Sequence, residues 1–211
     1  MIDSPEIRFQ ELIIATTNSG KLKEFELLLD QLPLLISGQP IDLDVEESGI
    51  TFAANARLKA EAVAKATSNW ALADDSGLSV FALNGAPGIH SARYAANDQE
   101  KINKLLDELD KALALNPEQG RKAQFVAALA LADPSGNVMF EVEGYCVGEI
   151  LDRPRGNGGF GYDPIFLVPE LGLSYAEIDK LTKASVGHRG RAFAKLLPQL
   201  EQLLFTNPAA M

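Results

Sequence analysis

The first third of the chain alternates short apolar runs with polar, glycine-containing loops. Residues 12–15 are all apolar and precede the polar run 16–20, which predicts a buried strand that ends in a loop. Leucine and phenylalanine then recur at helical spacing over residues 22–32, and Pro33 predicts the end of that helix. The pattern therefore begins with a strand, a polar loop and a helix.

Patterns of the same kind continue to residue 115. Thr51 is placed to cap a helix, because its side chain can accept a hydrogen bond from a backbone N–H within the first turn. The predicted elements are a loop over residues 37–50 with strand potential at 41–45, a helix at 51–68, strands at 70–73 and 78–83, and a helix at 98–115.

The second half of the chain predicts an antiparallel hairpin and a final helix. Residues 124–132 are apolar after Gln124, residues 138–150 alternate apolar and polar side chains, and the two segments flank the turn-forming segment 133–137. Residues 153–163 are glycine-rich and predicted to be irregular, and helical spacing returns at 190–204. Strands and helices mixed around a central hairpin indicate an α/β fold with a mixed β-sheet.

Length and organisation predict one domain spanning residues 1–211. The chain is 46% apolar, which is enough to build a core, and it shows no internal repeat, low-complexity tract or obvious linker. Residues 1–10 are expected to form a loosely ordered arm, and they lack the basic-then-apolar layout of a signal peptide.

Composition argues against several classes of protein. A formal charge of −10 does not suit a protein that binds nucleic-acid phosphates, since that affinity needs clustered Lys and Arg. No apolar run reaches the ~20 residues of a membrane-spanning helix. The single cysteine, Cys146, supplies neither an internal disulfide nor a thiolate zinc site. We therefore expect a cytoplasmic protein with no nucleic-acid or membrane partner.

The polar loop after the first strand is a candidate anion-binding site. A loop that leaves a buried strand and opens a helix presents free backbone N–H groups, and the helix dipole adds positive potential. Gly20 allows close approach and Lys21 adds a charge, although the spacing of a Walker A loop is absent. The alternative is an ordinary helix N-cap made by Asn18 or Ser19. The candidate residues are Thr16, Thr17, Asn18, Ser19, Gly20 and Lys21.

Two adjacent carboxylates, Asp74 and Asp75, stand at the predicted end of a strand and precede Ser76 and Gly77. Neighbouring side chains of an extended chain point in opposite directions, so one carboxylate can bind Mg²⁺ while the other is held by hydrogen-bond donors. Glu47 is a further oxygen ligand, and oxygen ligands without a Cys/His cluster favour Mg²⁺ or Mn²⁺ over zinc. The alternatives are an acidic turn for the aspartates and solvated surface charge for Glu47.

Residues 156–164 surround two aromatic side chains with four glycines. Such a segment loses much conformational entropy on ordering, so packing alone is a poor reason for it. Phe160 can stack on a purine ring, and Asp163 can accept hydrogen bonds from the edge of that ring. The alternative is a hairpin loop with one aromatic side chain packed beneath it.

Cationic residues near the start of the last predicted helix complete the candidates. His188 and Arg189 can donate to a carbonyl oxygen, and Lys183 can reach a phosphate or a base. The alternative is the ordinary polarity of a helix start. His90 is interpreted as structural, and no Ser-His-Asp or Cys-His arrangement has a recognisable local context.

In their order along the chain, these motifs closely resemble the inosine/xanthosine triphosphate pyrophosphatase family. The match covers about residues 12–197 and is most specific at Ala73-Asp74-Asp75-Ser76-Gly77-Leu78 and at Gly159-Phe160-Gly161-Tyr162-Asp163-Pro164. The other matching segments are Thr16–Lys21, Thr51-Phe52, Asn55-Ala56, Lys59-Ala60, Gly85–Ile89, Ser91–Tyr94, Ile165-Phe166 and His188-Arg189-Gly190.

The resemblance implies hydrolysis of non-standard purine nucleoside triphosphates (ITP, dITP, XTP) to the monophosphate and pyrophosphate, by Mg²⁺-dependent homodimers that cleanse the nucleotide pool. It also implies an elongated mixed β-sheet flanked by helices, with two lobes and an active-site cleft between them. By position, Thr16 to Lys21 would cradle the triphosphate, and Lys59 and Ser76 would contact the substrate. Asp75 would be the proton acceptor and a metal ligand, with Glu47 and Asp74 supporting the metal. Phe160, Gly161, Tyr162, Asp163, Lys183, His188 and Arg189 would hold the base.

Two positions depart from the pattern of the family. Its members usually have Glu three residues after Thr51, which completes a capping box, whereas Ala54 stands here, so we expect a loss of helix stability rather than of chemistry. The serine that precedes His-Arg in the family is Gly187 here, which leaves only its backbone to approach the base. Two other functions stay open: a pyrophosphatase for modified pyrimidine triphosphates, and a nucleotide-binding regulator that has lost hydrolysis.

Overall fold

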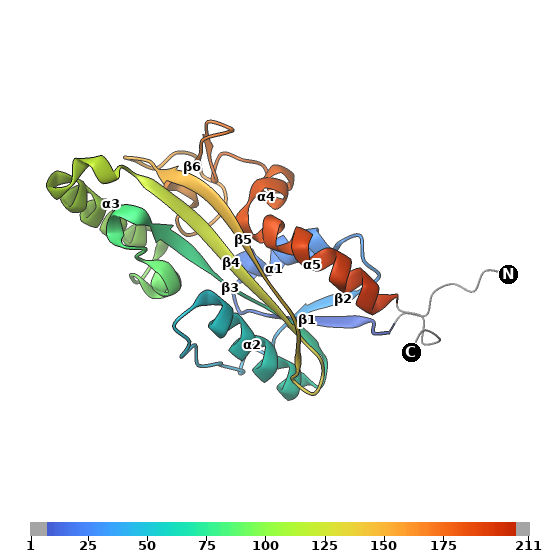
Figure 1. The fold of residues 1–211 in the computed structure, drawn as a ribbon. Helices are drawn as coiled ribbons and strands as arrows, with labels where there is room; N and C mark the ends of the chain where they lie inside the picture. Colours follow the sequence, from blue (N-terminus) through green and yellow to red (C-terminus); the bar gives the residue numbers. More distant parts are fainter. Residues whose placement is uncertain (1–7, 206–211) are drawn as a thin grey trace.

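The computed structural model describes residues 8–205, which form an open β-sheet with helices on both of its faces (Figure 1). The strands are β1 (Glu11–Ala15), β2 (Leu35–Gly38), β3 (Trp70–Val80), β4 (Lys122–Ala132), β5 (Val138–Ile150), β6 (Phe166–Val168) and β7 (Leu173–Ser174). The α-helices are α1 (Ser19–Leu29), α2 (Phe52–Thr67), α3 (Asp98–Leu115), α4 (Lys180–Val186) and α5 (His188–Leu204).

The sheet contains parallel and antiparallel pairs. Its strands follow the order β2-β1-β3-β4-β5-β6-β7. β1 pairs in parallel with β2 and with β3, whereas each of the later pairs is antiparallel. The hairpin of β4 and β5 forms the middle of the sheet, as its sequence pattern predicts. The mixed sheet expected from the sequence is therefore confirmed.

The side chains of β1 explain why helices cover both faces at this end of the sheet. Leu12 and Ile14 pack in the cluster that includes α1 and α5, whereas Ile13 and Ala15 pack in the cluster under α2. Successive strand side chains point to opposite faces, so a wholly apolar strand needs cover on both. Full burial of a Leu or Ile side chain contributes about 1.5–3 kcal/mol.

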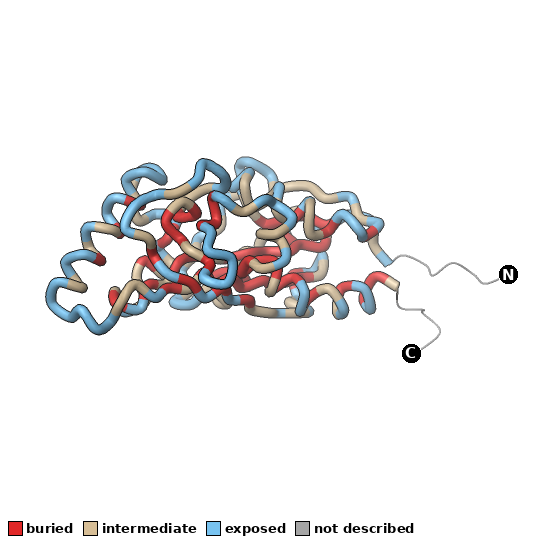
Figure 2. The backbone as a smooth tube through the Cα atoms, turned by 90° about the horizontal axis from the view of Figure 1, so that it is seen from above, coloured by how far each residue is buried: buried red, intermediate tan, exposed pale blue. Residues whose placement is uncertain are grey.

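A separate apolar cluster fills the other end of the sheet. It joins Leu78 and Val80 of β3 to Leu105 and Leu109 of α3 and to Phe166 of β6. The molecule is accordingly elongated, with buried segments running along its length (Figure 2). The long strands β3, β4 and β5 thus join two ends that have their own cores.

The strand potential predicted at residues 41–45 is wrong. The strand that pairs with β1 is β2, which lies earlier in the chain, and Ile41 is 96% exposed. The pairing stops at Gly38, and Pro40 follows without a backbone N–H for a ladder.

The two strands predicted at 70–73 and 78–83 are one continuous strand, β3, which a 3₁₀ helix follows. β4 pairs with β3 through the acidic segment as well, where Asp74 lies opposite Leu129. Cross-strand pairing here overrides the local turn preference of Asp, Ser and Gly. Asp74 and Asp75 therefore lie inside a strand and not at its end.

Smaller differences concern the ends of elements. α1 stops at Leu29, three residues before the predicted end, and α5 begins at His188, two residues before the predicted start. The short elements α4, β6 and β7 were not predicted, because they offer too few residues for a periodic pattern. Of the predicted arm, only residues 8–10 are described, and there Phe9 stacks on Trp70 with ring centroids 4.6 Å apart. That part of the arm is docked on the core.

Candidate active site

The candidate site lies where β1 stops and β3 continues. β1 ends at Ala15, which lies opposite Ala73 of β3. Beyond that point β3 keeps β4 as a neighbour but has lost β1, and the carbonyl oxygen of Asp74 accepts a hydrogen bond from Lys59 Nζ at 2.7 Å. Ligands of open α/β sheets commonly bind in the crevice outside the carboxyl ends of such strands.

Asp74 is fully buried on the α1 and α5 side of the sheet. Its Oδ2 lies 2.8 Å from Lys21 Nζ and 3.3 Å from Arg189 Nη2, and it accepts a hydrogen bond from Ser76 Oγ. Burial favours the protonated acid, but Arg189 and Lys21 outweigh it and hold the pKa of Asp74 well below its usual range. Asp74 Oδ1 is buried and has no hydrogen-bond partner among residues 8–205. An orphaned carboxylate oxygen of this kind is a place for a cation or a donor.

Asp75 points to the opposite face, as the extended chain predicts. Its Oδ2 accepts a hydrogen bond from Asn55 Nδ2 at 3.1 Å, and its Oδ1 lies 3.4 Å from Lys59 Nζ. Burial raises the pKa of the Asp75 carboxyl above its ordinary value, although Lys59 opposes the shift. A carboxylate with a raised pKa is a stronger proton acceptor than an ordinary surface aspartate.

Glu47 lies near Asp75, and Lys59 forms ion pairs with both. Lys59 Nζ lies 3.0 Å from Glu47 Oε1, and Arg93 Nη1 lies 2.6 Å from Glu47 Oε2. Burial would raise the pKa of Glu47, but Lys59 and Arg93 outweigh it and lower the pKa. Glu47 is thus half-buried and paired, which does not fit a merely solvated surface charge.

These carboxylates suit a hard divalent cation by their chemistry. Within residues 8–205, no three His, Cys, Asp or Glu side chains are gathered closely enough to hold a metal ion by themselves. Glu47, Asp74 and Asp75 are nevertheless oxygen donors, and Asp74 Oδ1 has no partner. The ammonium group of Lys59 also shows that a cation fits between the carboxylates of Glu47 and Asp75.

The loop between β1 and α1 makes the ordinary N-cap that the sequence analysis kept as its alternative. Asn18 Oδ1 accepts hydrogen bonds from the amides of Gly20 and Lys21, at 2.8 and 3.1 Å, and Thr16 Oγ1 accepts one from the Asn18 amide. Thr17, Asn18 and Ser19 are exposed, and Asn18 and Ser19 line a cavity beside Phe160. The same loop aims Lys21 at Asp74, so capping and positioning of a charge are both present.

The glycine-rich segment of residues 156–164, which we call the aromatic loop, packs against this N-cap. The Phe160 ring lies so close to Gly20 that a Cβ on Gly20 would be 2.8 Å from Phe160 Cδ1. The loop itself is held by two carboxylates: Asp163 accepts from the Phe160 amide at 2.9 Å, and Asp98 accepts from the Gly161 amide at 2.7 Å. A Cβ at position 20 would therefore force a shift in the contact between two segments far apart in the sequence.

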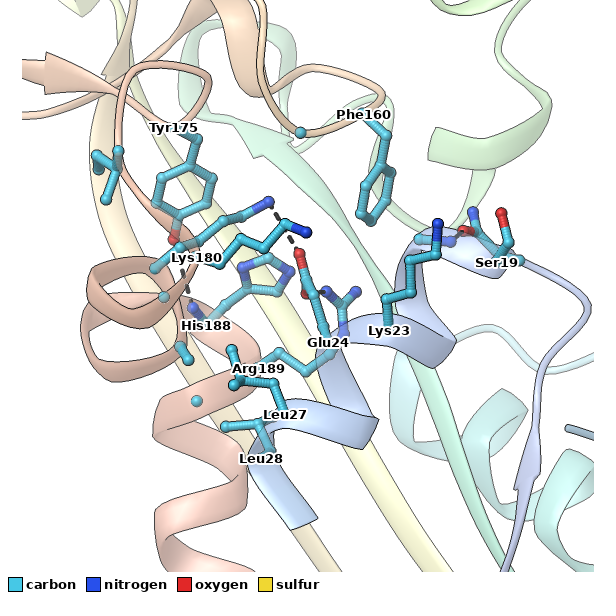
Figure 3. Close-up of a pocket in the computed structure, with 18 residues that line it drawn as sticks. Ser19, Lys23, Glu24, Leu27, Leu28, Phe160, Tyr175, Lys180, His188 and Arg189 are labelled. Carbon is cyan, nitrogen blue, oxygen red and sulfur yellow. Dashed lines mark hydrogen bonds and ion pairs between the residues drawn. The ribbon is translucent and has the colours of Figure 1, made fainter. Parts of the chain in front are cut away.

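A cavity of about 410 Å³ opens beside Phe160, between α1, α4 and the start of α5 (Figure 3). Glu24 of α1 points into it and forms ion pairs with Lys183, at 3.0 Å, and with Arg189. Lys183 also lies 2.6 Å from Asp163, and its ammonium is 5.0 Å from the centroid of the Phe160 ring. The cavity thus combines an aromatic wall with the paired charges of Glu24, Lys183 and Arg189, and Lys23 and Lys180 also line it.

His188 is buried at the inner end of this cavity. Its ring stacks on Phe125, with centroids 4.7 Å apart, and its Nδ1 has no hydrogen-bond partner. Burial lowers the pKa of His188 well below its ordinary value, and the neighbouring Arg189 adds to the shift. The imidazole is therefore neutral at physiological pH.

A second cavity, of about 180 Å³, is lined by residues from several of the motifs that the sequence predicts for the site. Lys21, Asp75, Ser76, Phe160 and His188 all line it. The aromatic loop and the carboxylates of Glu47 and Asp75, which we call the acidic centre, therefore meet at one crevice, as predicted. Two residues assigned to the base are engaged within the protein: Tyr162 is buried and donates through its hydroxyl to the Ser91 carbonyl, and the buried Asp163 holds Phe160 and Lys183.

The sequence analysis missed several residues of the site. Glu24 follows Lys21 by one helical turn, so a prediction that aims Lys21 inward also places Glu24 near the site. Asp98 and Lys101, at the start of α3, line the smaller cavity, and no local pattern marks them. Asn55 belongs to a motif of the resemblance, but its contact with Asp75 depends on the way α2 packs on β3.

The fold and the site together define an α/β protein with a buried acidic centre, surrounding cations and an aromatic wall at the edge of a mixed sheet. A model of the Ham1 family matches residues 12–199, and the chain belongs to the Ham1 family. No helix within residues 8–205 has the length and apolar character needed to cross a membrane.

Relatives and solved structures agree with this assignment. A dITP/XTP pyrophosphatase of Parasynechococcus marenigrum (strain WH8102) is 57% identical over 197 residues, which cover 93% of this chain and 98% of the relative. A HAM1 protein from Coxiella burnetii superposes with a TM-score of 0.81 at 41% identity, covering 92% of this chain and 100% of that one. The Ham1 protein of Staphylococcus aureus gives a TM-score of 0.77 at 42% identity, covering 91% of this chain and 98% of that one. The resemblance drawn from the sequence motifs is thus confirmed.

Proposed function

We propose that this protein hydrolyses non-standard purine nucleoside triphosphates (dITP, ITP and XTP) to the monophosphate and pyrophosphate, and so cleanses the nucleotide pool. The observation that carries the proposal is the meeting of Lys21, Asp75 and Phe160 at one crevice. Relatives more than 50% identical over most of the chain are dITP/XTP pyrophosphatases, which supports the same reaction.

The reaction can be written in terms of the residues that line the crevice. The triphosphate extends along the β1–α1 loop, where Lys21 and Lys59 exchange their carboxylate partners for phosphate oxygens. Water attacks the α-phosphorus, Asp75 accepts the proton, and the bond between the α-phosphorus and the bridging oxygen breaks as pyrophosphate leaves. The raised pKa of Asp75 suits that task.

Mg²⁺ is the cation that the donor set favours. We propose that Glu47 and Asp75, which lie together beside Lys59, would hold it, with Asp74 supporting the site from the opposite face of the sheet, and when bound it would neutralise charge on the phosphates. A homodimer and a cytoplasmic location are proposed on the family resemblance alone, and sedimentation of the purified chain tests the dimer.

The larger cavity beside Phe160 suits the purine. Phe160 offers a ring for stacking, and Lys183, His188 and Arg189 offer donors for a 6-oxo group. A 6-amino group would leave a donor without an acceptor, which costs about 1–3 kcal/mol for each buried group. Selection against adenine nucleotides follows from that loss.

Release of pyrophosphate tests the proposal directly. We expect rapid release from ITP, dITP and XTP with Mg²⁺, and much slower release from GTP and dUTP. Preference for dUTP would instead make the chain a pyrimidine triphosphate pyrophosphatase. Tight binding of ITP without any release would make it a nucleotide-binding regulator.

Asp75→Asn tests the assigned proton acceptor. An amide cannot take the proton from water, so we expect kcat to fall by about 10²–10⁴-fold. Binding of the product IMP, measured by titration calorimetry, should stay within a few-fold of the unmodified chain. A rate equal to that of the unmodified protein would remove Asp75 from this role.

A further inference from the structure

Asn55 is a buried amide that touches the acidic centre from α2. It is 1% exposed and lies in the first turn of that helix. Its Nδ2 donates to Asp75 Oδ2 at 3.1 Å, and its Oδ1 accepts from the backbone amide of Gly49 at 2.8 Å. Nothing in the proposed reaction uses this side chain as a reactant.

The two hydrogen bonds fix which way the amide faces. The Gly49 N–H can only donate, so it needs the oxygen of Asn55. The NH₂ group of Asn55 must then face Asp75, and a carboxylate can only accept from it. The contact with Gly49 is also tight, because a Cβ there would lie 2.6 Å from Asn55 Oδ1.

The same contacts tie the two carboxylates of the acidic centre to one helix. Gly49 lies two residues after Glu47, so Asn55 restrains the segment that carries Glu47. Lys59, one turn further along α2, contacts the carboxylates of both Glu47 and Asp75. α2 therefore approaches these carboxylates with one neutral donor and one cation.

The two carboxylate oxygens of Asp75 have different partners, because Asn55 binds only one of them. Oδ2 is committed to an amide that cannot release or take up a proton. Oδ1 faces only the ammonium of Lys59, at the longer distance of 3.4 Å, and Lys59 can turn to a phosphate. We propose that Asn55 is a positioning residue that holds Asp75 so that Oδ1 alone is presented to the attacking water, while it fixes the Glu47 segment at the same site.

This inference rests on the proposed function, and a variant series separates the two. Asn55→Ala removes both hydrogen bonds. Asn55→Asp is nearly isosteric and keeps an acceptor for Gly49, but it has no donor for Asp75. Thr51→Ala is the matched control, because Thr51 caps the same helix through the Ala54 amide and does not contact Asp75.

Release of pyrophosphate from ITP is measured for the unmodified chain and for each variant, together with IMP affinity by calorimetry and the melting temperature. We expect kcat of both Asn55 variants to fall at least 30-fold, with KM and IMP affinity within threefold, since Phe160, Lys183 and His188 lie on other elements. Thr51→Ala should lower the melting temperature and keep kcat within twofold.

The outcomes are distinct. An unmodified chain that releases no pyrophosphate refutes the proposed function itself. An active chain in which either Asn55 variant keeps kcat within threefold of Thr51→Ala refutes the positioning role alone. Loss of IMP affinity in step with kcat, or failure of both Asn55 variants to fold, would make Asn55 a residue of general structure and would also overturn the inference.

Discussion

His188 is an imidazole held without charge against aromatic rings. It stacks on Phe125 and lies 6.0 Å from Tyr175, centroid to centroid, and burial lowers its pKa well below 6.5. The unfolded chain exposes the same ring and binds a proton near the ordinary pKa of about 6.5. Between those two pKa values the unfolded state holds more protons than the folded state.

The stability of the protein should therefore fall as the pH drops below that of the unfolded imidazole. The contribution of His188 is complete above about pH 6.5 and declines by at most ~1.4 kcal/mol per pH unit below it. Urea unfolding at pH 7.5, 6.5 and 5.5 measures the slope. His188→Phe keeps an aromatic ring and should flatten it, and equal slopes in the two proteins would count against a neutral buried histidine.

At the scale of residues, the sequence reveals chemistry better than it reveals contacts. Lys21 and Asp75 were candidates because their types and neighbours suit phosphates and Mg²⁺, and the family resemblance alone singled out Asp75 as the proton acceptor. The role of Asn55 was not identifiable, because it depends on how closely α2 packs on β3. Asp163 was assigned to a ligand, yet its carboxylate binds Lys183 and the Phe160 amide within the protein.

At the scale of elements, α2 starts with half of a capping box. Thr51 Oγ1 accepts from the Ala54 amide at 3.1 Å, but Ala54 cannot return a hydrogen bond to the Thr51 amide. The first turn of α2 also carries no acidic residue to complement the helix dipole.

Ala54→Glu should repair both deficits. We expect a gain of about 0.5–1 kcal/mol in the free energy of unfolding, or ~1–4 °C in melting temperature for a chain of this size. Calorimetry measures the shift, and pyrophosphate release should stay nearly unchanged. A large gain in turnover would show that position 54 acts in the chemistry.

The contact between β5 and α5 depends on a glycine. A Cβ on Gly144 would lie 2.2 Å from the Ala192 amide nitrogen and 2.3 Å from the His188 carbonyl oxygen, both of which are backbone atoms. The start of α5, which carries His188 and Arg189, therefore sits directly on the strand.

Gly144→Ala should lift the start of α5 and lower the free energy of unfolding by about 1–3 kcal/mol, as overpacking commonly does. Gly38→Ala is the matched control, because a Cβ there meets Leu22 at an ordinary 3.5 Å and should be tolerated. Chemical denaturation measures both. Equal free energies of unfolding for the two variants would show that α5 shifts without a cost in stability.

Elements with a clear period were predictable, and elements that depend on partners were not. β5 followed from alternation, β4 from its apolar run before a turn, and α3 from its apolar stripe. β3 was divided in error, because Asp74 to Gly77 favour a turn until β4 supplies ten residues of pairing. β2 was misplaced for the same reason: its position is set by β1 and not by its own residues.

At the scale of the whole molecule, the site joins two ends that have separate cores. Lys21 lies on α1, which packs in the cluster at one end, whereas Tyr162, which also lines the crevice, packs with α3 in the cluster at the other end. A nucleotide held between them would connect the two ends and stabilise the folded state by mass action.

Saturating IMP with pyrophosphate should therefore raise the melting temperature. At one hundred times the dissociation constant the gain is about 2.7 kcal/mol. Differential scanning fluorimetry measures it, and AMP serves as the control, because its 6-amino group should give a smaller shift. Equal shifts with IMP and AMP would argue against selection through the 6-oxo group.

The class of fold was predictable because it follows from the order of strands and helices. The crevice itself was not, since its walls come from segments near residues 20, 75 and 160 that only the register of the sheet brings together. The family resemblance supplied that convergence in advance, through motifs whose spacing alone does not require it.

Three of the cations around the crevice already have anionic partners. Lys21 is paired with Asp74, Lys59 with Glu47, and Lys183 with Asp163. A polyphosphate that enters must replace resident carboxylates, so its arrival is an ion exchange within a nearly neutral enclosure. Salt in the solvent then screens the incoming and the displaced partner alike, and a passing polyanion such as RNA gains little from charge alone. A ligand displaces the resident carboxylates when it also fits the aromatic wall formed by Phe160.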